Sequence, residues 1–170
     1  LSGAESDLEV QNQVVIDHAD EGLITGDADL DLKQGLRISA GEVTSTAGTV
    51  SINGASSLSN GTLSVFSGTL ALGGSFEKNG GHFSLSDSAL RLLDNLTWTS
   101  DSLLELPELD LDNYSLTLGS DSSDLKVNND LIMYHDNEKL ISGNADLEFS
   151  GMLSISAVSY THLRAHETSV

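Results

Sequence analysis

Short pairs of apolar residues, separated by a single residue, recur along the chain beside regularly spaced glycines. A pair such as Leu70/Leu72 places two side chains on one face of an extended strand, while Ala71 between them faces the other way. The glycines follow one another at steps of six or seven residues: Gly35, Gly41, Gly48, Gly54, Gly61, Gly68, Gly74 and Gly81. The pattern therefore has a period of two within a segment and of about twenty between segments.

The apolar positions align in three columns at the longer period. The first column contains Val43, Leu63, Phe83, Leu103, Leu125 and Leu147. The second column contains Val50, Leu70, Leu90, Leu109, Leu131 and Leu153. The third and less regular column contains Leu36, Leu58, Phe76, Leu96, Leu116 and Leu140. Toward the N-terminus the same spacing continues through Leu8, Val15, Leu23 and Leu30.

These columns predict an all-β fold, a right-handed parallel β-helix (solenoid) of about seven coils, each with about 20 to 22 residues and three short strands. A coil cannot bury its inward face alone, so stacking of coils supplies the core. Glycine at each corner permits the sharp bend. Between Leu8 and Leu153 the rod would be about 34 Å long, at about 4.8 Å per coil. A β-sandwich is the competing fold. Its turn signals come about every 8 to 12 residues, whereas the glycines of this chain recur every six or seven residues, which favours the β-helix.

Composition and charge narrow the range of partners. The 170 residues contain 7 Lys and Arg against 26 Asp and Glu, a formal net charge of −19. Phosphate binding needs a basic face, so we expect no nucleic-acid partner and no attraction to an anionic membrane. No apolar run approaches the roughly 18 residues of a transmembrane helix. The absence of Cys excludes disulfides, thiolate metal sites and Cys nucleophiles.

The C-terminal segment differs in character from the rest of the chain. Residues Ala157 to Thr168 resemble a translated sequencing adapter of the transposase-library type, and they concentrate Arg164, His162 and His166 in a few positions. We therefore expect a β-helix fragment over 1–157, cut at both ends, and a non-native tail over 158–170. The −19 charge then belongs to the native part, because Arg164 and Glu167 cancel in the tail.

One acidic cluster is a candidate metal site. Asp27, Asp29 and Asp31 alternate along one strand, which places three carboxylates on one face, and oxygen ligands of this kind suit calcium. The alternative interpretation is a solvated outer face with Leu30 and Leu32 directed inward. No catalytic residue and no other cofactor is predicted. The histidines at 18, 82 and 135 lie far apart in sequence and are expected on the surface or in turns.

The column assignment makes three further predictions. Arg91 lies outward between Leu90 and Leu92 and should pair with Asp110 in the next coil. Trp98 should belong to the core. Acidic and amide residues that follow the last regular glycine, Asp87, Asp94, Asp101 and Asn113, should occupy corners, because Asp and Asn tolerate left-handed backbone conformations.

In coil length and composition, over about Leu8 to Ile155, the chain resembles the passenger and stalk regions of bacterial surface proteins, such as autotransporters and filamentous-haemagglutinin-type adhesins. The resemblance implies a non-enzymatic repeat scaffold for adhesion or display, located outside the cell or on the bacterial surface. It also implies no cofactor and a surface glycan or protein as partner. Open coil ends would favour self-association. The alternative is a fragment of a carbohydrate-active β-helix enzyme, a polysaccharide lyase or glycoside hydrolase.

Overall fold

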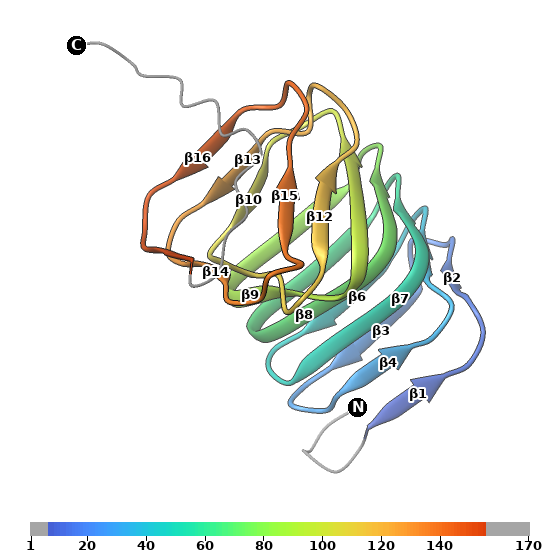
Figure 1. Ribbon diagram of the computed structural model, residues 1–170. Helices are drawn as coiled ribbons and strands as arrows, with labels where there is room; N and C mark the ends of the chain where they lie inside the picture. The colour runs from blue at the N-terminus through green and yellow to red at the C-terminus, as the bar shows by residue number, and fades with distance from the viewer. Residues whose placement is uncertain (1–6, 156–170) are drawn as a thin grey trace.

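The computed structural model of the chain describes residues 7–155 as strands joined by turns and bends. Parallel strands stack along one axis as a β-solenoid of about seven turns (Figure 1). The predicted all-β fold with parallel stacked coils is confirmed, and no helix occurs within the described range. The tail predicted over 158–170 lies outside the described residues, so its origin stays a prediction.

Each coil runs through three faces before the next coil begins. The first face holds β1 (Leu8–Val10), β4 (Leu30–Leu32), β11 (Glu108–Asp110), β14 (Leu131–Met133) and β17 (Leu153–Ile155). The second face holds β2 (Val14–Ile16), β5 (Leu36–Ile38), β12 (Ser115–Leu118) and β15 (Lys139–Ile141). The third face holds β3 (Gly22–Thr25), β6 (Glu42–Ser45), β10 (Leu104–Leu106), β13 (Leu125–Val127) and β16 (Leu147–Phe149).

The middle coils depart from the predicted pattern of three separate short strands. There, β7 (Thr49–Leu58), β8 (Thr62–Lys78) and β9 (His82–Ser100) each continue around one or two corners. The corners of neighbouring coils lie in register, as Gly54 does with Gly74, so the hydrogen-bonded ladder passes through the bend. The faces in this region are consequently joined into a single 14-stranded sheet, apart from the three-stranded sheet β10–β13–β16.

The second predicted column is confirmed over its whole length. Its six residues lie opposite one another in consecutive coils, from Val50 to Leu153. Those from Val50 to Leu131 are between 0% and 3% exposed. At roughly 25 cal/mol per Å² of apolar surface removed from water, each such leucine contributes about 1.5 to 3 kcal/mol of stability. This column is the central part of the core.

Three aromatic rings join the core near the middle of the rod. Trp98 is fully buried, as predicted, and stacks on Phe76 with ring centroids 4.7 Å apart and planes inclined by 3°. Phe83 meets Trp98 edge-on at 5.0 Å. Aromatic pairs in such arrangements contribute about 0.5 to 1.5 kcal/mol beyond their burial.

Two predicted column members are wrong by one residue. β10 places Leu104 opposite Leu125, and Leu103 is 52% exposed. In β2, Val14 is directed toward the core and Val15 is 46% exposed. In both places two apolar residues are adjacent in the sequence, so the pattern does not determine which of them is directed inward. A shift of one residue exchanges the two faces of a strand.

The third predicted column is wrong in a different way, because it combines members of several columns. Phe76 lies opposite Trp98, Leu58 lies opposite Ile38, and Leu96 lies opposite Leu116. A register shift in β9 causes part of the error. Leu92 lies 20 residues after its partner Leu72, whereas Leu96 lies 22 residues after its partner Gly74.

The predicted corner glycines are confirmed by their backbone conformation. All eight have positive φ, from 66° at Gly81 to 127° at Gly68. At Gly68, an added Cβ would overlap the carbonyl oxygen of Gly48 in the preceding coil. Among the other predicted corners, Asn113 has a φ of 76°, whereas Asp87, Asp94 and Asp101 are not among the described residues with positive φ.

We predict that Gly68→Ala destabilises the solenoid by at least about 3 kcal/mol, because the methyl group adds a clash with the neighbouring coil to left-handed backbone strain. The matched control is Gly143→Ala. Gly143 also has positive φ, 59°, but nothing lies within 4 Å of the position that an added Cβ would take, so only the strain of about 1 kcal/mol is expected. Chemical denaturation measures both values, and equal losses would contradict the close stacking of corners.

Candidate functional site

The three residues predicted to bind calcium lie at and beside β4. Asp31 is at the centre of the strand, and its carboxylate contacts the Lys33 ammonium group, which also lies 3.8 Å from Glu9. The hydrogen bond from Lys33 to Asp31 raises the pKa of Lys33 above its usual value. Asp29 precedes the strand, and its Oδ1 accepts a hydrogen bond from the Thr49 backbone N–H at 2.6 Å.

Asp29 and Asp31 therefore have partners within the protein, while Asp27 lies before the strand. Within residues 7–155, one group of three potential ligand atoms lies within 4.8 Å, and it belongs to Asp17, His18 and Glu21. The calcium interpretation of Asp27, Asp29 and Asp31 stays a prediction.

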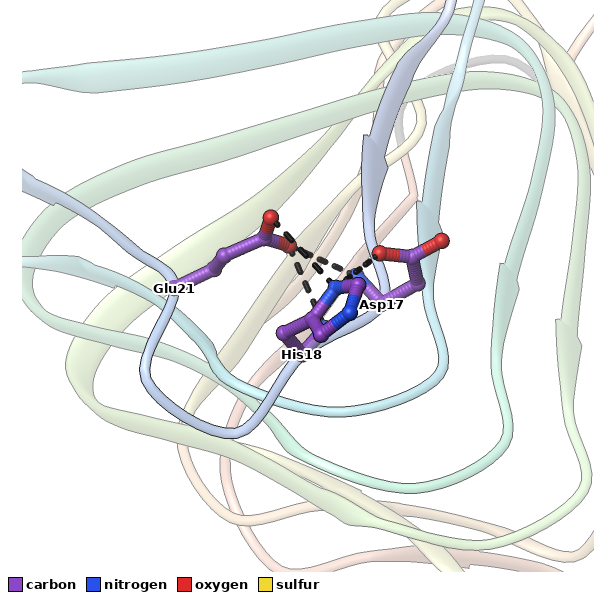
Figure 2. Close-up of side chains that lie close together, drawn as sticks. All are labelled: Asp17, His18 and Glu21. Atoms are coloured by element: carbon purple, nitrogen blue, oxygen red, sulfur yellow. Dashed lines mark hydrogen bonds and ion pairs between the residues drawn. The ribbon is translucent and has the colours of Figure 1, made fainter.

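Asp17, His18 and Glu21 form the corner between β2 and β3, where Figure 2 shows their side chains converging. The Asp17 Oδ1 lies 2.6 Å from His18 Nδ1, and Glu21 Oε1 lies 3.7 Å from the same nitrogen. Glu21 Oε2 accepts hydrogen bonds from the backbone N–H groups of Asp17 and His18, at 2.9 and 3.2 Å. The Glu21 carboxylate thus closes its own turn, and all three side chains are about half exposed or more.

The same His-x-x-Glu turn recurs at the corner between β14 and β15. Glu138 donates its backbone N–H to the His135 carbonyl, as Glu21 does to His18. Its side-chain Oε2 accepts from the His135 N–H at 3.0 Å, and Oε1 accepts from the Asn113 N–H in the preceding coil at 2.6 Å. Glu138 is 7% exposed. Both turns have the sequence His-x-x-Glu. The prediction of surface or turn positions for the histidines did not include this shared motif.

Side-chain oxygens of Asp and Asn also connect successive coils. Each accepts a hydrogen bond from a backbone N–H that lies 20 or 22 residues later, one coil along the rod. The pairs are Asp7 with Asp29 (3.1 Å), Asp29 with Thr49 (2.6 Å), Asn95 with Ser115 (3.0 Å), Asp124 with Asp146 (2.9 Å) and Asp130 with Met152 (3.3 Å). These corner acids and amides have a structural role, because they satisfy N–H groups that the bends remove from the ladder.

The predicted alignment of Arg91 with Asp110 in the neighbouring coil is confirmed, but the predicted ion pair between them is wrong. Arg91 lies opposite Asp110 in the neighbouring strand. Its guanidinium group instead binds Asp112, with Nη2 and Nε 2.7 and 2.9 Å from Oδ2. Asp110 Oδ1 accepts the Asp112 backbone N–H at 3.0 Å, and this turn carries the Asp112 carboxylate toward Arg91.

Grooves on the outer surface of residues 7–155 include an acidic groove and a third-face groove. The acidic groove, of about 560 Å³, lies beside the His18 turn and includes Asp20, Glu21 and Glu42. The third-face groove, of about 420 Å³, is lined by His82, Phe83, Ser84, Leu85, Ser86, Glu105, Pro107, Asn128 and Asn129. The third-face groove brings the Glu105 carboxylate together with the amides of Asn128 and Asn129, which the sequence columns did not do.

Comparisons with known proteins do not assign the chain to a family. A scan against protein-family models, a search of curated proteins and a search of solved structures each found no match. Over residues 7–155 there is also no helix with the length and apolarity needed to cross a bilayer. Function is therefore inferred from the geometry of the rod and its grooves.

We predict that Glu138→Ala lowers stability by about 2 to 3 kcal/mol, because it leaves the backbone N–H groups of Asn113 and His135 without their buried acceptor. The matched variant Glu21→Ala removes the equivalent acceptor from an exposed turn, where water can replace it. Its expected cost is below about 1 kcal/mol. Urea denaturation compares the two, and a larger effect for Glu21→Ala would contradict this assignment.

Proposed function

We propose that the chain is a non-enzymatic repeat scaffold of a secreted or cell-surface bacterial protein, which serves as a stalk for adhesion or display. The observation that carries the proposal is the continuous column from Leu30 to Leu131, paired in parallel register from coil to coil. In such a stack each coil contacts its neighbours alone, so the number of coils sets the reach of the rod.

The basic residues give a second line of support. Lys33 pairs with Asp31, Arg91 with Asp112 and Lys126 with Glu148, in three different coils. A carbohydrate-active enzyme of this fold would bring basic and acidic side chains together on one outer face. Basic side chains in separate ion pairs, spread along the rod, favour the scaffold over the enzyme.

The rod geometry makes a direct distance prediction. Glu9 and Ser154 occupy the same outward column of the first face, seven coil steps apart. Because the chain contains no Cys, spin labels at Glu9→Cys and Ser154→Cys report one distance. We expect about 34 Å, and about 24 Å for the control pair Ser51→Cys and Ser154→Cys, which are five steps apart. Double electron–electron resonance measures both distances, and equal values would contradict a stacked rod.

Localisation and activity test the function itself. An antibody raised against the chain should label intact, unpermeabilised cells of the source organism or detect the protein in the medium. Labelling that requires permeabilisation would contradict the proposal. Purified protein mixed with neutral and acidic polysaccharides should release no reducing ends and no unsaturated products. Cleavage that is lost on substitution of one outward acidic residue, with the fold retained, would establish the enzyme alternative instead.

A further inference from the structure

Asparagine is followed directly by glycine at three places in the chain: Asn53-Gly54, Asn60-Gly61 and Asn79-Gly80. In such a pair the glycine backbone nitrogen can attack the side-chain carbonyl carbon of the asparagine, because glycine has no Cβ to shield the nitrogen and adopts a wide range of backbone conformations. The attack requires a nitrogen that is free of other hydrogen bonds and a backbone that can move. The fold provides these conditions at two of the three pairs.

The first reactive pair, Asn60-Gly61, lies in the corner between β7 and β8, and the Asn60 side chain is exposed. The ladder stops before this pair and resumes after it. The N–H groups of Ser59 and Thr62 both donate to carbonyl oxygens of the preceding coil at 3.0 Å. Among residues 7–155, no backbone hydrogen bond is donated by Gly61. Its nitrogen is therefore available beside an exposed amide.

The second reactive pair, Asn79-Gly80, occupies the equivalent corner one coil later, between β8 and β9. Asn79 is exposed, and its N–H donates to the Leu58 carbonyl oxygen at 2.9 Å. The ladder resumes at His82, whose N–H donates to the preceding coil at 2.7 Å. Within the described part of the chain, the Gly80 N–H donates no backbone hydrogen bond. This pair therefore has the same free nitrogen as the first one.

The third pair, Asn53-Gly54, lies inside β7 and is held on both sides. Asn53 lies opposite Gly73, and Gly54 lies opposite Gly74, in the following coil. Toward the preceding coil, a Cβ added to Gly54 would lie 3.2 Å from the backbone of Gln34. Asn53 is exposed like the other two asparagines, so the difference is the pairing of the backbone. Attack at this position requires local opening of the ladder, which costs free energy.

We propose that Asn60 and Asn79 are sites of spontaneous deamidation and that the β7 ladder protects Asn53. The glycine nitrogen forms a bond to the asparagine Cγ, the Cγ–Nδ2 bond breaks, and ammonia leaves with the proton of the glycine N–H. Water then opens the resulting succinimide ring at either carbonyl. The products are aspartate, or isoaspartate, in which the main chain runs through Cγ. The amide and water become a carboxylate and ammonium, without any oxidation or reduction.

The modification changes both charge and backbone at the corners. Asn60 lines the acidic groove, so a carboxylate there adds to those of Asp20, Glu21 and Glu42. Isoaspartate also lengthens the main chain where successive coils match closely, because a Cβ added to Gly61 would lie 2.6 Å from a carbonyl oxygen of the preceding coil. We therefore expect the isoaspartate form to stack less stably than the original chain. This chemistry is independent of the proposed scaffold function.

The test incubates the folded chain in heavy-oxygen water at mildly alkaline pH, which favours loss of the proton from the attacking nitrogen. Peptide mass spectrometry then measures the labelled carboxylate formed at each asparagine, and electron-transfer fragmentation distinguishes aspartate from isoaspartate. We expect Asn60 and Asn79 to react at least about 10-fold faster than Asn53, because the ladder must open before Asn53 can react. In concentrated urea, where no ladder remains, the three asparagines should react at similar rates.

Two matched variants confirm the assignment. Asn60→Gln and Asn79→Gln keep an exposed amide at the corner, but the longer side chain closes a larger and less favourable ring. Each variant should lose the label at its own corner and keep it at the other, with an unchanged melting temperature.

Three results would overturn the proposal: a rate at Asn53 in the folded chain equal to those at Asn60 and Asn79, the same order of rates in urea as in the folded chain, or no label at Asn60 and Asn79 in the folded chain when the unfolded chain reacts.

Discussion

The hydrogen-bonded contact between successive coils is the constraint on which the rest of the structure depends. A single coil has too little inward surface to form a core, and each coil buries its leucines only when the next coil lies directly on it. The coils must therefore present matching outlines, strand against strand and corner against corner. Gly48 and Gly68 illustrate the requirement, because a side chain at Gly68 would occupy the space of the Gly48 carbonyl oxygen. The regular spacing of the corner glycines and of the inward leucines follows from this match between successive coils.

The same constraint gives the acidic residues a role. Bends leave backbone N–H groups without a strand partner, and the carboxylates of Asp29, Asp124 and Asp130 accept such groups from the next coil. Hydrogen bonds to an ionised acceptor are shorter and stronger than neutral ones, which favours Asp over a neutral side chain at these positions. Part of the −19 charge therefore stabilises coil stacking, while the rest keeps the outer surface solvated.

The fold could be predicted from the sequence because two separate patterns, the spacing of the glycines and the columns of leucines, show the same period of about twenty residues. The second column is correct because apolar residues alternate with small, polar or charged ones in most of its coils, as in Leu90-Arg91-Leu92, and this alternation determines which side chains are directed inward. The first column contains Leu103 in place of Leu104 because two adjacent leucines fit the period equally well, and the side chain directed inward depends on how the preceding corner is turned. The third-face groove could not be predicted, since an interrupted ladder leaves no periodic signal.

A change in coil length and a change in strand pairing occur in the same part of the rod. Between Leu72 and Gly74 the register of β9 gains two residues, so the partner spacing changes from 20 to 22. The next coil remains paired with β9 on the first and second faces, whereas on the third face β10 pairs with β13. The aromatic rings of Phe76, Phe83 and Trp98 fill the core at this point. Identical coils would make every segment of the rod equivalent, so the register shift and the aromatic rings beside it distinguish this segment of the scaffold from the others.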